Sequence, residues 1–299
     1  MASEINYDHC VCCGSAAINK VFTCKDYTVS NEYFEIWQCK ACTFRFTQNA
    51  PDEAAIGKYY QSAEYISHSD TKKGFINLLY HYVRNFTLTT KLNLVKKVTG
   101  LKQGILLDVG AGTGAFVFTM QQAGWNVTGL EPDKTARNNA FNNYKLQLEE
   151  LNNLYNLPDN SFDAITLWHV LEHVHELHNY IEKFHKILKS AGTLIIAVPN
   201  YTSYDSDHYK QYWAAYDVPR HLYHFSPESM RVLLAQKGFA VEAVKPMWFD
   251  SFYVSMLSEK YRYGKNRFVN ALLVGLLSNI KVIFNVKKCS SVIYVVRRK

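Results

Sequence analysis

The stretch DVGAGTGAF, residues 108–116, follows the apolar run GILL and sets three glycines close together at the end of an expected strand. Glycine has no Cβ, so such a loop lets the backbone approach a ligand closely. Gly110, Gly112 and Ala115 satisfy the dinucleotide fingerprint G-x-G-x-x-G/A, and Glu131 follows roughly 20 positions on, where a ribose-binding acid belongs. The pattern alone leaves open whether the ligand carries phosphate.

Two features favour a ligand without phosphate. Asp108 opens the loop, and a carboxylate there would repel a pyrophosphate, whereas beside a cationic ligand it is tolerated or useful. The later block LPDNSFDAITLWHVLEHV, residues 157–174, is the second feature, because it contributes to a family resemblance described below.

From residue 104 the chain alternates strand-like and helix-like segments. The expected strands are GILLDVG, NVTGLEP, SFDAITLWHV, GTLIIAVPN, FAVEAVKPM and SSVIYVVRR. This rhythm predicts an α/β, Rossmann-like doubly wound fold with a parallel sheet and helices on both faces. Ligands of such sheets bind beyond the carboxyl ends of the strands, where the glycine loop lies.

Three motifs in this order, DVGAGTGAF, the acid in GLEP and FDAITLWHVLEHV, resemble the glycine loop, ribose acid and fourth-strand motif of class I S-adenosylmethionine-dependent methyltransferases. The resemblance covers roughly residues 75–250. It implies S-adenosylmethionine as the cofactor and S-adenosylhomocysteine as its product, but it does not identify the methyl acceptor.

The resemblance also implies a set of cofactor contacts. Glu131 would accept hydrogen bonds from both ribose hydroxyls. Leu151 and Asn152 fall where the family contacts adenine, although many relatives have an aspartate there. Trp168 would wall the methyl-donor site, and core packing is its alternative role. The full expected set is Asp108, Gly110, Ala111, Gly112, Glu131, Leu151, Asn152, Trp168 and His169.

Residues 217–230, DVPRHLYHFSPESM, fall between the expected strand GTLIIAVPN and the next helix, where the family places substrate-binding residues. A polar cluster in an aromatic setting could bind an acceptor and remove its proton. His221 is the first candidate base and His169 the second. A hydrogen-bonded structural corner is the alternative. The expected substrate-binding residues are Asp217, Arg220, His221 and His224.

The string HVLEH, residues 169–173, also matches the inverted zinc-peptidase motif H-x-x-E-H. That motif needs both histidines on one helix, whereas His169 is expected to end a strand. The peptidase interpretation is therefore not favoured. His175, His178 and His185 follow at helical spacing and are expected to form a solvated face.

Six of the seven cysteines lie in the first 42 residues. Two of the pairs have the spacing C-x-x-C, which predicts a closed tetrahedral site of four thiolates and hence a structural zinc ribbon. Plain reduced thiols are the alternative. Cys12 and Cys24 are surplus to the site. The expected ligands are Cys10, Cys13, Cys39 and Cys42.

The net charge of +7 comes largely from a basic C-terminal end, so a nucleic-acid partner is not expected. The polar start MASEINYDHC shows no secretory leader, and we expect a cytoplasmic protein. Residues 268–286 repeat apolar side chains at helical spacing. Packing of this stripe on its own domain is the favoured interpretation. Peripheral membrane contact through residues 268–288 is the alternative.

We therefore expect a zinc ribbon over residues 1–50, a helical lead-in over 51–100, and a methyltransferase domain over 101–299 with a helical insertion at about 252–287. The expected function is methyl transfer to a small molecule such as a sugar, glycan or lipid-linked intermediate. RNA methylation, cofactor binding without catalysis, and NAD(P)-dependent oxidoreduction are the alternatives. The oligomeric state is left open.

Overall fold

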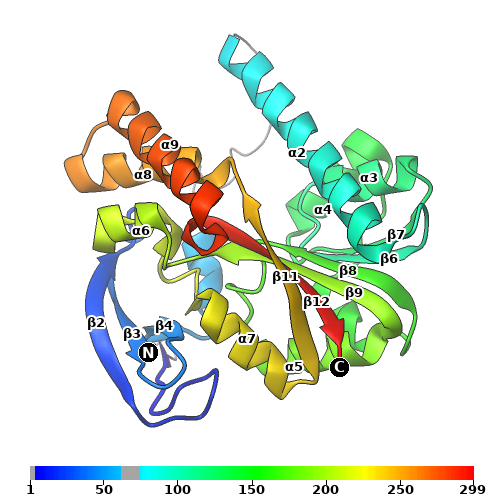
Figure 1. Cartoon of the computed structure of the whole chain (residues 1–299), viewed down its shortest axis with the longest axis horizontal. Helices are drawn as coiled ribbons and strands as arrows, with labels where there is room; N and C mark the ends of the chain where they lie inside the picture. Colours follow the sequence, from blue (N-terminus) through cyan, green and yellow to red (C-terminus); the bar gives the residue numbers. More distant parts are fainter. Residues whose placement is uncertain (1–3, 62–74) are drawn as a thin grey trace.

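A computed structural model describes residues 4–61 and 75–299, with only the backbone described for residues 75–83. Its main feature is a six-stranded sheet in the order β11-β12-β9-β8-β6-β7, with helices on both faces (Figure 1). The strands are β6 (Ile105–Val109), β7 (Asn126–Leu130), β8 (Phe162–Trp168), β9 (Leu188–Pro199), β11 (Phe239–Met247) and β12 (Ser291–Arg298).

Alternate residues of the central strands enter two separate hydrophobic cores. Leu107 and Val109 join the core that includes α5 and α7, whereas Leu106 joins the core that includes α2 and α3. The strands therefore read as continuous apolar runs, as expected for a sheet covered on both sides. The helices are α2 (Phe75–Thr99), α3 (Ala115–Gln122), α4 (Lys134–Tyr144), α5 (Leu177–Ile187), α6 (Tyr204–Tyr209), α7 (Pro227–Gln236), α8 (Asp250–Tyr263) and α9 (Phe268–Phe284).

The expectation of an all-parallel sheet is wrong at one strand. β12 runs antiparallel to both β9 and β11. Met247 at the end of β11 pairs with Ser291 at the start of β12, so the chain leaves the sheet and re-enters it at the same end of the strands. The α8–α9 insertion therefore closes an antiparallel pair rather than a crossover connection.

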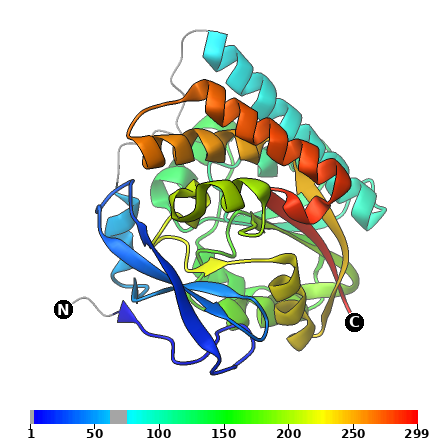
Figure 2. The same cartoon turned by 60° about the vertical axis from the view of Figure 1, so that its left-hand side comes forward.

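The N-terminal segment forms a second, antiparallel sheet in the order β10-β4-β3-β2. Three strands come from the cysteine-rich head: β2 (Ile18–Lys25), β3 (Tyr33–Cys39) and β4 (Arg45–Gln48). The fourth strand, β10 (Tyr223–His224), comes from the segment expected to bind substrate. A short pair, β1 (Glu4–Ile5) with β5 (Ala50–Pro51), closes the head. The head thus shares a sheet with the later chain (Figure 2).

Five 3-10 segments complete the described elements, at Ile56–Tyr60, Leu151–Asn156, Lys210–Tyr212, Ala214–Tyr216 and Val286–Lys288. The lead-in consists of the first of these and α2. The part of the expected lead-in that spans residues 62–74 lies outside the described residues.

The expectation that the apolar stripe of residues 268–286 packs on its own domain is also wrong. The residues of α9 that face the protein are Ala271, Val274, Gly275, Ser278 and Val282. A Cβ on Gly275 would lie 2.6 Å from Cδ1 of Phe252 on α8, so small side chains allow the two helices their close approach. The large apolar residues consequently point outward. In the part of the chain that the structure describes, no helix has the length and apolar character needed to cross a bilayer.

Candidate functional site

The glycine loop lies at the carboxyl end of β6, between the ends of β7 and β8. The backbone N–H groups of Gly110 and Ala111 donate to the Leu130 carbonyl at 2.8 and 2.9 Å, which closes the loop onto β7. Gly110 has a φ of 72°, and a Cβ there would lie 2.4 Å from Cγ2 of Val170. Glycine is therefore required at this position both by conformation and by space.

Glu131 follows the end of β7 and is held by this loop. Its Oε2 accepts from the Gly112 N–H at 2.7 Å and its Oε1 from the Asp133 N–H at 2.9 Å. Burial raises the pKa of Glu131, and these two N–H donors oppose the rise. Leu151 and Asn152 begin the 3-10 segment after Glu149, whose carbonyl accepts the Glu131 N–H at 2.9 Å. The structure thus brings the expected ribose and adenine residues together.

Asp108 is almost fully buried beneath the loop, and Thr166 Oγ1 donates to its Oδ1 at 2.6 Å. Burial raises the pKa of Asp108 to about 7, although the charge of Lys91 acts in the opposite direction. Lys91 comes from α2 and its Nζ lies 4.3 Å from the ring centroid of Trp168. Nothing in the helical pattern around Lys91 distinguishes it from a surface lysine, so sequence reasoning missed it.

His169 lies directly after β8 in a left-handed conformation, with a φ of 59°, that non-glycine residues rarely adopt. Its Nε2 lies 3.0 Å from Asp250 Oδ2 and its Nδ1 lies 3.3 Å from Glu172 Oε1. Burial alone would lower the pKa of His169, but the two carboxylates outweigh burial and raise it to about 10. His169 is therefore an imidazolium near neutral pH and lacks the lone pair that a base needs.

A cluster of three titratable side chains adjoins His169. Glu172, His173 and His221 bring one carboxylate oxygen and two ring nitrogens within 4.8 Å of one another, a donor set that could also hold a metal ion. The Glu172 side chain is fully buried, and its contact with His169 is an ion pair without hydrogen-bond geometry. The rings of His173 and His221 meet edge to face, with centroids 4.6 Å apart. Burial and the charge of His221 lower the pKa of His173 to about 4, so His173 stays neutral.

The hydrogen bond of the His221 ring to the Ala215 carbonyl defines the tautomer of the neutral ring. Nδ1 lies 2.9 Å from the Ala215 carbonyl oxygen, which can only accept, so Nδ1 carries the proton in the neutral ring. Nε2 then bears the lone pair, and it lies 4.0 Å from Asp217 Oδ2. His221 is thus arranged as a proton acceptor beside a carboxylate.

The other residues of the expected substrate cluster contact the protein. Arg220 donates to Asp217, to Asp26 and to the Tyr59 carbonyl, at distances of 2.6 to 3.0 Å. His224 Nε2 lies 3.1 Å from Thr47 Oγ1 on β4. Both side chains therefore hold the 217–224 segment in place.

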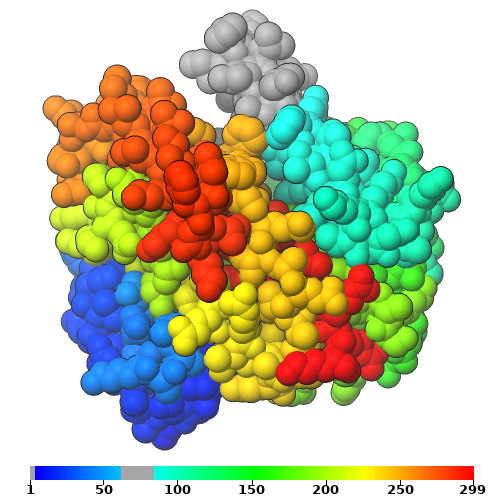
Figure 3. Space-filling view, in the orientation of Figure 1, coloured from blue at the N-terminus to red at the C-terminus, as the bar shows by residue number. Residues whose placement is uncertain are grey.

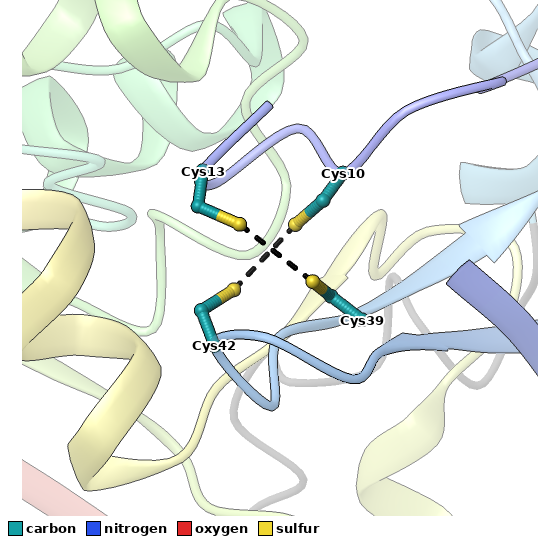
Figure 4. A group of neighbouring side chains, drawn as sticks. All are labelled: Cys10, Cys13, Cys39 and Cys42. Atoms are coloured by element: carbon teal, nitrogen blue, oxygen red, sulfur yellow. Dashed lines mark hydrogen bonds between the residues drawn. The ribbon is translucent and has the colours of Figure 1, made fainter. Parts of the chain in front are cut away.

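The four expected cysteine ligands come together as one cluster (Figure 4). The Sγ atoms of Cys10 and Cys42, and those of Cys13 and Cys39, are 3.6 Å apart. A tetrahedral site with zinc–sulfur bonds of about 2.3 Å separates its sulfurs by about 3.8 Å, so these positions fit a zinc ion. Cys12 lies outside the cluster, where its Sγ donates to the Ser229 carbonyl at 3.6 Å.

The histidines of α5 and of the turn before it do not form the solvated face expected of them. His178 Nε2 lies 2.6 Å from the Val11 carbonyl in the cysteine turn, and His175 Nε2 lies 3.2 Å from the Pro51 carbonyl. The ring of His185 packs against Phe239. Residues 171–173 form a turn, so HVLEH also lacks the helix that a zinc-peptidase motif requires.

Comparison with known proteins agrees with the resemblance found in the sequence. A family model described as a methyltransferase domain matches residues 81–244. This match covers more than half of the chain, and the chain therefore belongs to this family of the class I methyltransferases. The match favours S-adenosylmethionine over a dinucleotide for the glycine loop.

The curated relatives and solved structures that resemble this chain share about a third of its residues or fewer over the matched segments. The mitochondrial ubiquinone biosynthesis O-methyltransferase of Rattus norvegicus is 29% identical over 189 residues, which are 57% of this chain and 54% of the relative. A demethylmenaquinone methyltransferase of Tropheryma whipplei is 32% identical over 105 residues, or 33% and 44% of the two chains. The chain spans about half the length of the curated relatives it matches. A SAM-dependent methyltransferase structure from Archaeoglobus fulgidus is 16% identical with a TM-score of 0.49, covering 76% of this chain and 100% of that chain.

The cysteine cluster predicts a specific response to mutation. Cys39→Ser removes one of four thiolates, and we expect loss of bound zinc and a fall of about 10 °C in the melting temperature. The matched control is Cys12→Ser, which keeps the four ligands and should keep about one zinc per chain. Zinc is measured by elemental analysis and melting by circular dichroism. Full zinc content in Cys39→Ser would show that the cluster is not a metal site.

The buried carboxyl of Asp108 predicts a pH-dependent stability. Its pKa of about 7 in the folded chain lies above its ordinary value of 3.8, so the folded chain loses stability as pH rises between these values. Asp108→Asn keeps an acceptor for Thr166 and removes this loss. We expect the variant to melt several degrees above the wild type at pH 8 and close to it near pH 4.5. The exposed Asp159→Asn is the control, and a pH-independent gap for Asp108→Asn would contradict the assignment.

Proposed function

We propose that this chain transfers a methyl group from S-adenosylmethionine to a hydroxyl of a small acceptor. The observation that carries the proposal is the position of His221, which we interpret as a proton acceptor. His221 lies in one cluster with Glu172, and Glu172 contacts His169 at the end of β8, next to the glycine loop. Small sugar, glycan or lipid-linked acceptors contain such a hydroxyl. The name of the rat relative includes O-methylation, which supports an oxygen acceptor.

The loop and its neighbours fit S-adenosylmethionine, which supplies an electrophilic methyl group on a sulfonium when bound. Glu131, oriented by two backbone donors, would accept hydrogen bonds from the ribose. The carboxylate of Asp108 would favour the positive charge of the cofactor, and Lys91 would favour its carboxylate. Trp168 and Phe116, whose ring centroids lie 5.5 Å apart, would exclude water from this side of the site.

In the proposed reaction, His221 Nε2 would take the proton of the acceptor hydroxyl as its oxygen bonds to the methyl carbon; the bond between that carbon and the cofactor sulfur would break, and S-adenosylhomocysteine would leave. The resulting imidazolium would lie near the carboxylates of Asp217 and Glu172. Burial would raise the pKa of each acid, but Arg220 beside Asp217 and His169 beside Glu172 outweigh it and lower both values. His173 stays neutral and adds no opposing charge. The proton would leave His221 for solvent before the next turnover.

Cofactor binding is the first test of the proposal. Calorimetric titration with S-adenosylhomocysteine should give a micromolar-range Kd, with no binding of NAD or NADP. Glu131→Ala should weaken binding by at least about 100-fold, because two charge-assisted hydrogen bonds are lost. The control is the exposed Glu150→Ala, which should bind as the wild type does. Dinucleotide binding, or an unchanged Kd in Glu131→Ala, would reject the proposed cofactor site.

The role of His221 is tested by turnover. Release of S-adenosylhomocysteine is followed with a panel of phenolic and sugar hydroxyl acceptors. His221→Asn should lower kcat by about 10²–10⁴-fold, with its affinity for S-adenosylhomocysteine unchanged. His185→Asn is the control. His185 packs against Phe239 at the start of β11, whereas the site lies at the carboxyl ends of the parallel strands. Equal turnover by His221→Asn and the wild type would exclude His221 as the base.

A further inference from the structure

The outer face of α9 is an exposed apolar surface. Its nine large side chains are between 41% and 83% exposed. Figure 3 shows α9 running over the surface of the molecule, next to α8. The nine residues, which we call the α9 face, are Phe268, Val269, Leu272, Leu273, Leu276, Leu277, Ile280, Ile283 and Phe284.

The rotation of α9 is set by its inner contacts. Ser278 Oγ donates to the buried carboxylate of Asp205 at 3.0 Å, and Asn279 Nδ2 donates to the Trp248 carbonyl at 2.8 Å. Gly275 is packed against Phe252. A surface helix ordinarily turns its apolar face to the core and its polar face to water. Here the small and polar residues face the protein, so the outward position of the large apolar residues is built into the packing.

The apolar surface continues onto the neighbouring elements. Trp248 and Phe249, just before α8, are each 43% exposed, and Tyr253 on α8 is 51% exposed. Phe86 on α2 meets Phe249 edge to face, with ring centroids 5.6 Å apart. Contiguous apolar surface beyond a few hundred Å² marks an interaction site on a protein. This surface is therefore the candidate interaction site of the described residues.

The charges around the α9 face are positive. From residue 251 to residue 299 the only acid is Glu259, which is 1% exposed and lies beside Arg267. Asp250 is turned inward to His169, and Asp207 on α6 pairs with Lys288. The cations on α8, on α9, between them and in the 3-10 segment after α9 are Lys260, Arg262, Lys265, Arg267, Lys281, Lys287 and Lys288.

We propose that the α9 face docks the protein on an anionic lipid bilayer, with α9 lying in the plane of the interface. An exposed apolar face beside lysine and arginine is the pattern of an interfacial helix, in which apolar burial and attraction to anionic headgroups add together. A second copy of this chain fits less well, because a symmetric contact would bring two positive rims together.

Docking would place the membrane next to His169 and the neighbouring cluster of Glu172, His173 and His221. Asp250 is both the first residue of α8 and the ion-pair partner of His169, and the exposed Trp248 and Phe249 immediately precede it. An acceptor with an apolar tail would therefore reach the site from the bilayer side. This last step rests on the proposed methyl transfer, whereas the docking itself does not.

Vesicle co-sedimentation tests the proposal. The full chain is mixed with phosphatidylcholine vesicles, alone or with roughly 30% phosphatidylserine. We expect sedimentation with the anionic vesicles, reduced by raised salt because the charge attraction is screened. The variant Leu272→Glu/Leu276→Glu should lose at least 10-fold in vesicle affinity. Phe141→Glu is the matched control, since Phe141 is a 48% exposed aromatic on α4, and it should bind as the wild type does.

Two further measurements separate the outcomes. The melting temperature and the S-adenosylhomocysteine affinity of Leu272→Glu/Leu276→Glu should match the wild type, since both leucines are exposed. Wild-type chain that stays in the supernatant with both vesicle types overturns the proposal. So does a wild-type dimer that the same variant converts to monomer without any vesicle binding, because the partner is then a second copy. Neither result bears on methyl transfer, since the assay contains no acceptor.

Discussion

The guanidinium of Arg220 joins three segments that are far apart in the sequence. It is 1% exposed and contacts Asp26 of the ribbon, the Tyr59 carbonyl of the lead-in, and Asp217 three residues before it. A buried charge that loses its partner typically costs about 3–5 kcal/mol of stability, so these contacts are needed together. The position of His221, the next residue, depends on them. The ribbon thus holds the segment that carries the proposed base, His221.

Charges of opposite sign alternate from the glycine loop to the ribbon. The charge of Lys91 acts on the carboxylates of Asp108 and Asp250, and His169 lies between Asp250 and Glu172. Beyond His221, Arg220 lies between Asp217 and Asp26. Because each buried charge has a neighbour of opposite sign, the site can keep several ions in a low-dielectric interior.

Sequence reasoning identified which residues lie together where the signal was local. The glycine loop, Glu131 and the two C-x-x-C pairs each depend on residues within a short stretch, and the structure brings the predicted partners together. It missed Lys91, Glu172 and Asp250, because their roles arise from tertiary contacts that no spacing encodes. The orientation of α9 was missed for another reason. Periodicity reveals two faces of a helix, but the recurrence of Ala271, Gly275 and Ser278 was the clue to which face packs inward.

The shared strand β10 has a consequence for how the protein is made. The cysteine turns and strands β2 to β4 are synthesised first, yet Phe46 on β4 pairs with Tyr223, which is added only after most of the large sheet has been translated. Until then the edge of β4 has no strand to pair with. The head therefore completes its sheet late, and an ion captured early by the cysteines would hold an open, unfinished module together while the ribosome finishes the chain.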